Sequence, residues 1–539
     1  MQNALEIAPE SGSAPEIESE TESQPPASPP SRSFSQIIRN VLVNWTAFAV
    51  TLLSGFWMMP FLIRHLGEAE YAVWIITGSL VSYLGLLDFG ITQSTVKYVA
   101  EHRARGDQAA INRVVTSGLS VFSVVGAFSL LASLGLALHF NRFFPSQLPD
   151  STVAIVVALV GLNVAITFPA SVFLGVLRGY QRYDIGAAAM SVSIVTRCAV
   201  IAWVISDGYG LVALAAITLF FDVLRLVYVT YRVFRLNSDI RIGRAHFASS
   251  ELKKLFGHSV WIFLIMVGDQ INFATDTIVI GYFLPPVALT IYAIAGRLVT
   301  YLRQLVLEMV GVLMPAVSGL HAQDDAAGVE ALLVAGAKWT TLLALPPAAV
   351  FWVLGERFIS LWIGPKYAPG ASQLLDILTV GVLAHLAEMT VTTVLVGTGR
   401  ARVVARWVVA QALVNLALSL ILIRTYGLVG VALGTTISMV GFALASIPTY
   451  FHFHLRVSLV SFIKNALAGP LWAQIPFVAA LFLLRYFVPM PSLPAFFGAI
   501  FLLAPLYGAT VFALCLDAGE RAAVCARLGW KKRVSAASS

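Results

Sequence analysis

The sequence predicts an all-α polytopic membrane protein with about fourteen transmembrane helices. Of its 539 residues, 58% are hydrophobic and only 12% are charged. A soluble domain has roughly 25% charged residues, and about half of any folded surface is exposed to solvent. Lipid must therefore surround most of this protein. The second observation is that apolar runs long enough to cross a membrane recur along the whole chain.

An acidic tail precedes the first of these runs. Residues 1–35 are rich in Glu, Ser and Pro and hold few large apolar side chains, so we expect a disordered cytoplasmic tail and no signal peptide. After it, apolar runs of about 18 to 27 residues alternate with short polar breaks, and each run can cross about 30 Å of hydrocarbon. The predicted spans are 40–63, 71–92, 114–138, 152–174, 187–206, 211–231, 258–283, 287–312, 336–362, 373–396, 404–424, 428–450, 465–488 and 495–516.

Lysine and arginine placement predicts the orientation of these spans. Cytoplasmic breaks hold an excess of Lys and Arg, and with the N-terminus inside most of the basic residues fall in inner breaks. The outer breaks then hold only Arg64, Arg142, Arg357, Lys366, Arg424 and Arg485. Both termini are thus expected in the cytoplasm. The net charge of +7 follows from this asymmetry, and no nucleic-acid partner is expected.

Three segments of the first half recur in the second half at nearly one offset. GSLVSYL at 78–84 returns as GRLVTYL at 296–302, GVLRGYQR at 175–182 aligns with TVLVGTGR at 393–400, and DGYGLVALAAIT at 207–218 returns as RTYGLVGVALGT at 424–435. Such repeats predict two lobes related by a pseudo-twofold axis along the membrane normal. The expected divisions are six-helix lobes at 36–240 and 241–457, two further helices within 458–518, and a basic cytoplasmic tail at 519–539.

Ionisable side chains within the spans are the first functional candidates, because charge in hydrocarbon is expensive. Asp269, Asn272 and Asp276 are spaced by three and four residues in the span 258–283. This spacing places them on one face of a helix. Since that span opens the second lobe, the face is expected to line a cavity between the lobes.

The next span carries a second stripe, formed by Arg297, Tyr301, Gln304 and Glu308, while Arg303 is expected to point elsewhere. One hypothesis is that Arg297 binds an anionic head group while carboxylates couple a cation or bind sugar hydroxyls. The alternative is an interhelical Asp–Arg pair that only fixes packing.

Other polar residues in the spans allow two interpretations each. Asn44 lies on a polar side of the first span, which could line the cavity or join helices. Arg197 has no partner nearby in sequence and is a cavity candidate. Asp222 and Arg225, one turn apart, are expected to form a local ion pair.

His385 and Glu388 share a helical turn and could either shuttle a proton or form a satisfied pair. Cys198, Cys515 and Cys525 are isolated, so we expect no disulfide, metal site or cofactor. No nucleophile–base constellation or phosphate loop is present in the sequence, which argues against an enzyme.

Several short segments resemble those of a known family. They comprise Asn44, Gly55, Pro60, Leu66, Gly67, Tyr71 and Trp74, then LLDFGITQSTVKYVAEHRARGD at 86–107, GVLRGYQRY at 175–183, TDTIVIGYF at 275–283, MPAVSGL at 314–320 and LWIGPKY at 361–367. With these segments the chain resembles the polysaccharide-transporter family, which includes O-antigen and oligosaccharide-lipid flippases. This family is part of the multidrug/oligosaccharidyl-lipid/polysaccharide exporter superfamily.

The resemblance implies flipping of a polyprenyl-diphosphate-linked oligosaccharide from the cytoplasmic to the outer leaflet of a bacterial inner membrane, for lipopolysaccharide or exopolysaccharide synthesis. The implied partners are this lipid-linked substrate, the bilayer and the polysaccharide polymerase machinery. Guanidinium groups pair well with phosphate, so Arg297 and Arg197 would meet the diphosphate. The other substrate-binding candidates are Tyr301, Gln304, Asn44 and Asn272. The implied cation-coupling residues are Asp269, Asp276, Asp88 and Glu308.

Four alternatives remain open from the sequence. A drug/cation antiporter of the same superfamily normally has twelve helices, so the two extra spans favour the flippase. A lipid II flippase differs mainly in its substrate. A membrane-embedded transferase and a non-transporting scaffold are the minor alternatives.

Overall fold

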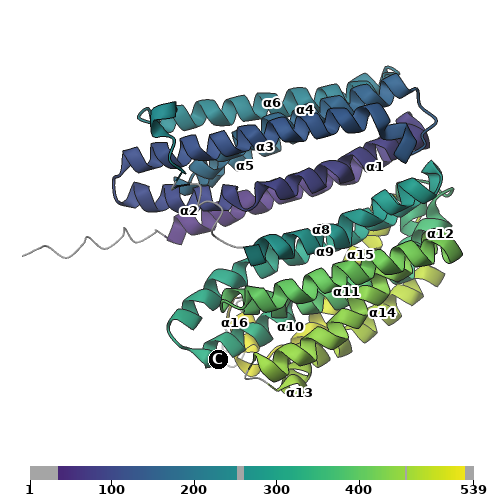
Figure 1. Cartoon of the computed structure of the whole chain (residues 1–539). Coiled ribbons are helices and arrows are strands. Elements are labelled where there is room, and N and C mark those ends of the chain that lie inside the picture. Colours follow the sequence, from purple (N-terminus) through teal and green to yellow (C-terminus); the bar gives the residue numbers. More distant parts are fainter. Residues whose placement is uncertain (1–33, 250, 252–259, 456–457, 528–539) are drawn as a thin grey trace, which may run out of the picture.

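The protein is a bundle of long helices, as expected (Figure 1). The computed structural model describes residues 34–249, 251, 260–455 and 458–527, and no strand occurs among them. The predicted tail at 1–33 and the last residues of the chain, 528–539, lie outside the described residues. The main helices are α1 (Phe34–Leu84), α2 (Ile91–Ala104), α3 (Gln108–Phe143), α4 (Asp150–Gly179), α5 (Tyr183–Ser206), α6 (Leu211–Leu236), α8 (Val260–Phe283), α9 (Pro286–Ala322), α10 (Ala326–Trp362), α11 (Ala368–Gly397), α12 (Ala401–Phe453), α14 (Gly469–Phe487), α15 (Leu493–Leu514) and α16 (Ala518–Arg527).

Twelve helices in the described part of the chain are long and apolar enough to cross a membrane. Two of them, α1 and α12, are each interrupted by one glycine with non-helical dihedral angles, Gly67 at φ 76° and Gly427 at φ 56°. Positive φ is readily adopted only by glycine, so each glycine allows the chain to turn between two predicted spans. The structure thus has twelve candidate spanning helices in its described part, where the sequence predicted about fourteen, and α1 and α12 each cover two of the predicted spans. We call the end of the bundle that holds both glycines the outer end, following the orientation that the charges predict.

The sequence prediction was wrong about the end of the second span. It extended the span to residue 92, whereas α1 ends at Leu84, followed by a 3-10 turn η1 (Gly85–Asp88) and, after Gly90 at φ 77°, by the separate helix α2. The side chain of Asp88 accepts hydrogen bonds from the backbone N–H (3.2 Å) and hydroxyl (2.8 Å) of Thr92. These bonds stabilise the first turn of α2.

The helices form two lobes, which confirms the predicted fold class. Helices α1 to α6 pack mainly with one another, and helices α8 to α12 do the same (Figure 1). The lobes meet where α1 packs against α8 and α9. Residues of these three helices are therefore the first candidates to line a cavity between the lobes.

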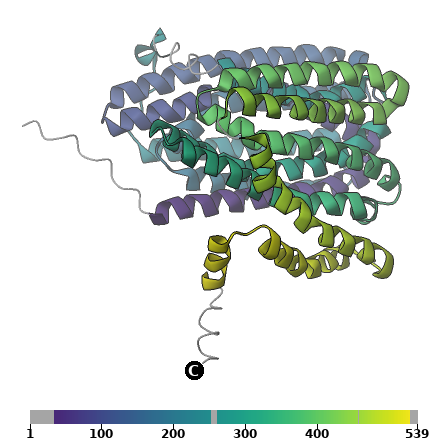
Figure 2. The same ribbon diagram turned by 90° about the horizontal axis from the view of Figure 1, so that it is seen from below.

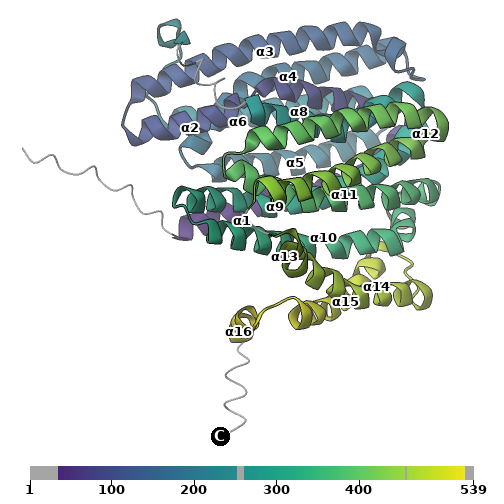
Figure 3. The ribbon, with the colours of Figure 1, turned by 60° about the horizontal axis from the view of Figure 1, so that its bottom comes forward.

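The last two long helices lie outside both lobes. Helix α14, preceded by α13 (Leu459–Phe462) and the π-helical segment η3 (Ile463–Ala468), packs against α10, and α15 packs mainly against α14 (Figure 2). The helix pair extends from the side of the C-terminal lobe (Figure 3). Part of the predicted C-terminal tail is helical: Glu520 of α16 bonds to Lys338 of α10, with 2.6 Å between Oε2 and Nζ.

Apolar side chains cover much of the outer surface of the bundle. Leu138 of α3 is 79% exposed, and Leu502 of α15 is 79% exposed. Apolar patches of this extent are rare on a soluble monomer. They fit a protein whose helices face hydrocarbon, and the chain is a multi-pass membrane protein.

Candidate functional site

One face of α9 contacts the other lobe. Tyr301 of α9 lies against Gly55 of α1, where a Cβ would be only 2.8 Å from the phenolic oxygen. That oxygen is buried and has no hydrogen-bond partner among the described residues. The guanidinium of Arg297 lies 5.9 Å from the centre of the Tyr301 ring. The predicted stripe on α9 thus borders the junction of the two lobes.

The charged members of this stripe are exposed. Arg297 and Glu308 are exposed and Gln304 is half-buried, and neither charged side chain forms an ion pair within the described part of the protein. Arg297 is therefore a membrane-depth cation whose guanidinium is available for an anionic ligand.

The carboxylate of Asp269 pairs with Arg303, not with Arg297. Arg303 Nη2 lies 3.0 Å from Asp269 Oδ2, and the guanidinium stacks 3.9 Å from the centre of the Phe273 ring. Arg303 was expected to point away from the Arg297 stripe, towards another helix or the inner interface, and it faces α8. The Asp269 side chain remains 36% exposed, so the ion pair is not fully buried.

Asp276 occupies a buried polar cluster between α8, α9 and α12. Its carboxylate accepts hydrogen bonds from Tyr292 (2.5 Å), Thr435 (2.7 Å) and Ser419 (3.3 Å). Asn415 accepts bonds from the same Ser419 (3.4 Å) and Thr435 (3.1 Å) hydroxyls. The cluster gathers one negative charge with neutral oxygen atoms, a donor set suited to a monovalent cation or a proton.

Asn272 extends this cluster along α8. Asn415 Nδ2 donates to the Asn272 backbone carbonyl and to its side-chain oxygen, both at 3.3 Å. The Asn272 side-chain nitrogen is buried without an acceptor among the described residues. Asn272 therefore joins α8 to α12 inside the C-terminal lobe, whereas the sequence placed it in the substrate cavity.

Sequence reasoning missed the partners of Asp276. Asn415 and Ser419 lie one turn apart in an otherwise apolar stretch of α12, so their spacing was a usable signal. Thr435 and Tyr292 gave no such signal in the sequence, because a single Thr or Tyr in a span often serves only in helix packing.

The remaining N-lobe candidates are held by local partners. Arg197 and Arg225 both lie near Asp222, at 3.5 and 3.7 Å, and Asn163 donates to the same carboxylate at 2.9 Å. The expected Asp222–Arg225 pair is present, and Arg197 has a partner that the sequence did not indicate. Asp88 caps α2, as described above. The side chain of Asn44 lies outside the described residues.

His385 and Glu388 of α11 are buried, yet they are not a satisfied pair. Ser446 donates to Glu388 Oε1 at 2.6 Å, but Glu388 Oε2 and both ring nitrogens of His385 have no partner among the described residues. The edge of the Phe273 ring lies against His385, with 5.3 Å between ring centres. Buried His385 and Arg303 of the Asp269–Arg303 pair thus contact the same Phe273 ring.

Polar contacts join the lobes at the outer end. Lys366 Nζ donates to Glu68 Oε1 at 2.5 Å, and the Tyr367 hydroxyl donates to the same oxygen at 2.9 Å. The bond to the Glu68 carboxylate raises the pKa of Lys366 above its ordinary value. Nearby, Trp362 Nε1 donates to the Phe56 carbonyl at 2.9 Å. This group of residues was not anticipated from the sequence.

The chain is a membrane protein of two packed helical lobes with polar residues at their junction, and solved structures share this fold. The chain resembles a lipid II flippase in an inward closed conformation, with a TM-score of 0.69 and 16% identity over 88% of this chain and 98% of that one. It also resembles an inward-facing multidrug transporter, with a TM-score of 0.65 and 15% identity over 79% of this chain and 99% of that one.

The family model described as "Polysaccharide biosynthesis protein" matches residues 86–372, more than half of the chain, and the chain belongs to this family. A Shigella flexneri protein named as an O-antigen transporter is 22% identical over 75% of this chain and 95% of its own length. A Haloferax volcanii protein named as a low-salt glycan biosynthesis flippase is 22% identical over 75% of this chain and 80% of its own length. The chain is thus a membrane transporter of polysaccharide biosynthesis and not an enzyme, and the family resemblance is confirmed.

Proposed function

We propose that the chain flips a polyprenyl-diphosphate-linked oligosaccharide from the cytoplasmic to the outer leaflet of a bacterial inner membrane by alternating access. The observation that carries this proposal is that Arg297 is exposed and unpaired among the described residues. Its exposed guanidinium lies beside the junction of the lobes, and no described carboxylate pairs with it. Guanidinium groups bind phosphate oxygens through two parallel hydrogen bonds. Arg297 is therefore the first contact that we assign to the diphosphate.

Two neighbours would complete this contact. The Tyr301 hydroxyl, which has no described partner, would bond to a phosphate or sugar oxygen. Arg303 would provide a second guanidinium when the diphosphate competes with Asp269 for it. The half-buried Gln304 and the exposed Glu308 lie on the same helix face and would contact sugar hydroxyls.

Asp276 and its hydroxyl partners are our proposed coupling site. The cluster is buried within the C-terminal lobe, so a cation bound there would change the packing of α8, α9 and α12. Two of these helices, α8 and α9, also pack against α1 of the other lobe. Cation binding would thereby be linked to the relative position of the lobes. Asp269 is assigned a different role: it pairs with Arg303 and holds its guanidinium until the diphosphate competes for it.

The other implied residues receive different roles. We assign Arg197 to N-lobe packing with Asp222, Asp88 to the cap of α2, and Asn272 to the support of the Asp276 cluster. Asn44 remains a substrate-binding candidate. With both termini in the cytoplasm, the outer end would deliver the product to the polysaccharide polymerase machinery.

A deletion strain tests the proposal in cells. We expect the lipid-linked oligosaccharide to accumulate on the cytoplasmic face and surface glycan to fall, with recovery on complementation by the wild-type gene. Surface glycan that stays normal in a strain without any other flippase would contradict the proposal. Loss of drug efflux would favour the antiporter, and loss of lipid II at the outer face would favour the lipid II flippase.

A further inference from the structure

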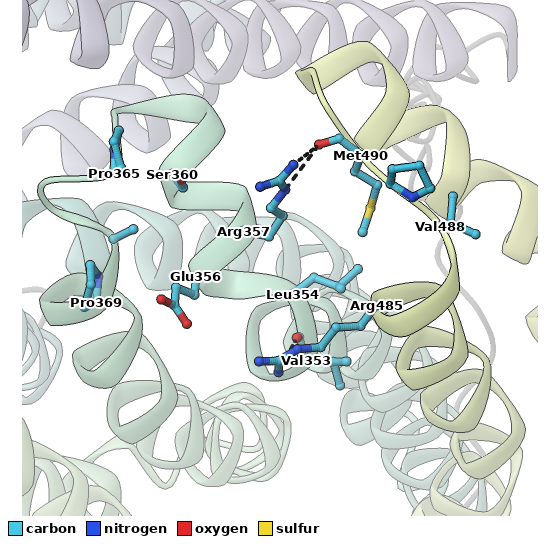
Figure 4. Close-up of a pocket in the computed structure, with 12 residues that line it drawn as sticks. Val353, Leu354, Glu356, Arg357, Ser360, Pro365, Pro369, Arg485, Val488 and Met490 are labelled. Atoms are coloured by element: carbon cyan, nitrogen blue, oxygen red, sulfur yellow. Dashed lines mark hydrogen bonds between the residues drawn. The ribbon is translucent and has the colours of Figure 1, made fainter.

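A cavity of about 420 Å³ lies at the outer end of the C-terminal lobe, beside the turn whose Lys366 and Tyr367 contact Glu68 of the other lobe. It is bounded by the last turns of α10, the turn that leads into α11, and the end of α14. Figure 4 shows Arg357 and Glu356 entering it from α10 and Arg485 entering from α14. The charged side chains of two separately packed elements thus converge on one cavity.

The two arginines are fixed in place by backbone carbonyls. Arg357 donates from Nε and Nη2 to the Met490 carbonyl at 3.2 and 2.8 Å, and Arg485 donates from Nη1 to the Val353 carbonyl at 3.1 Å (Figure 4). Neither arginine forms an ion pair with a described carboxylate. A guanidinium has five N–H donors, so each arginine retains donors for a ligand. The cavity therefore holds two oriented cations that are not neutralised by direct pairing.

Glu356 adds one negative charge to the same cavity. Its side chain is exposed and forms no hydrogen bond or ion pair within the part of the chain that the structure describes. In Figure 4 it points away from Arg357, towards Pro369. The carboxyl of Asp376, on α11, also lies close enough to interact with the charges of Arg485 and Glu356. Two cations and these carboxyl groups complement a ligand that carries both a phosphate and an ammonium group.

The surroundings of the cavity place it at the edge of the bilayer. Trp352 and Tyr486, exposed by 52% and 80%, flank it. Exposed Trp and Tyr side chains are typical of the membrane–water interface. Helix α15 has one buried residue, Phe496, and more than half of its residues are exposed. Acyl chains can therefore lie along α14 and α15 beneath a head group in the cavity.

We propose that this cavity binds the head group of an aminophospholipid of the outer leaflet. Arg357 and Arg485 hold its phosphate, Glu356 holds its ammonium group, and the acyl chains lie against α14 and α15. The bound lipid would fill the gap between the helix pair and the C-terminal lobe. This site does not depend on the substrate that the transporter moves.

Native mass spectrometry of the full-length protein in detergent tests the site, with phosphatidylethanolamine and phosphatidylglycerol added in turn. We expect the wild-type protein to retain phosphatidylethanolamine in preference. R357Q/R485Q should lose about tenfold in affinity for it, as expected from one or two lost charge-assisted hydrogen bonds. E356Q should keep a phospholipid but lose the preference for the amine. R424Q changes another exposed arginine at the outer end and serves as the matched control.

Two results with the variants would overturn the proposal. One is wild-type binding of phosphatidylethanolamine by R357Q/R485Q, and the other is an unchanged head-group preference in E356Q. The E356Q variant keeps both arginine–carbonyl contacts, so it remains informative if the double variant fails to fold. Glycerophosphoethanolamine, which lacks acyl chains, should compete only weakly; competition equal to that of the lipid would point to a soluble phosphate ligand and contradict the lipid site.

Discussion

Tyr301 of α9 and Gly55 of α1 meet across the two lobes, with the phenolic oxygen 2.8 Å from where a Gly55 side chain would begin. Gly55→Ala should therefore overpack the junction and lower stability by about 1–3 kcal/mol. Tyr301→Phe removes the oxygen that the new methyl group would meet. Gly55→Ala should therefore lower stability much less in the Tyr301→Phe background than in the wild type. Thermal unfolding of the purified protein measures both effects. Gly78→Ala, at a helical glycine with open space around it, should change little, and an equal loss there would refute the contact.

The Asp269–Arg303 pair should matter for stability more than Arg297 does. Arg303→Ala leaves the Asp269 carboxylate unpaired, which should cost about 1–3 kcal/mol, whereas Arg297→Ala breaks no described ion pair. The double variant Asp269→Ala/Arg303→Ala should be more stable than Arg303→Ala alone. Chemical unfolding of the wild type, Asp269→Ala, Arg303→Ala and the double variant gives the coupling. A coupling of zero would mean that the ion pair does not contribute.

Asp276 should control any dependence of transport on a monovalent cation. Asp276→Asn keeps the shape of the side chain but removes its charge, so stabilisation of the purified protein by Na⁺ or by protons should disappear. Thr435→Val removes one hydrogen bond to the carboxylate and should weaken the cation effect by about tenfold. Asp222→Asn is the control, since Asp222 lies in the other lobe. A cation effect that survives in Asp276→Asn places the coupling site elsewhere, and Glu388 would be the next candidate.

Closure of the outer end should depend on Glu68 and Lys366. A carbodiimide should join the Glu68 carboxylate to the Lys366 amine, which lie 2.5 Å apart, and this amide should arrest transport. Lys366→Arg retains the charge but forms no stable amide, so the reagent should then leave transport unaffected. Mass spectrometry of the cross-linked peptides identifies the bond. Because the pKa of Lys366 is raised, the ion pair should persist up to the ordinary pKa of lysine and be lost only at higher pH.

Failure to recover the joined peptides from wild-type protein would show that the lobes are apart at this end under the conditions used. Arrest of the Lys366→Arg variant by the reagent would show that the effect arises at another carboxylate.

The fold was largely predictable because its signals are local. Runs of apolar residues mark the helices, and the repeat between 78–84 and 296–302 indicates the two lobes. The broken helices were predicted as pairs of spans, since the polar breaks around Gly67 and Gly427 are visible in the sequence. Helix α2 was missed because the largely apolar segment 85–91 extends the preceding span up to its first residue, and the rest of α2 is too short and polar to cross a membrane.

The site was less predictable because its contacts join distant helices. Spacing correctly placed Arg297 and Tyr301 on one face of α9, but it could not show which arginine faces Asp269. That choice depends on how α8 and α9 cross. Likewise, only the fold brings Ser419 and Thr435 to Asp276, or Lys366 to Glu68.

The central claim is tested most directly by flipping in proteoliposomes that contain only this protein. The substrate is a fluorescent polyprenyl-diphosphate oligosaccharide, and its transfer is followed by a quencher that does not cross the bilayer. We predict transfer by the wild-type protein, a decrease of about tenfold or more for Arg297→Ala, and no change for Arg142→Ala, an exposed outer-end arginine. A folded Arg297→Ala protein that flips the lipid at the wild-type rate would contradict the account.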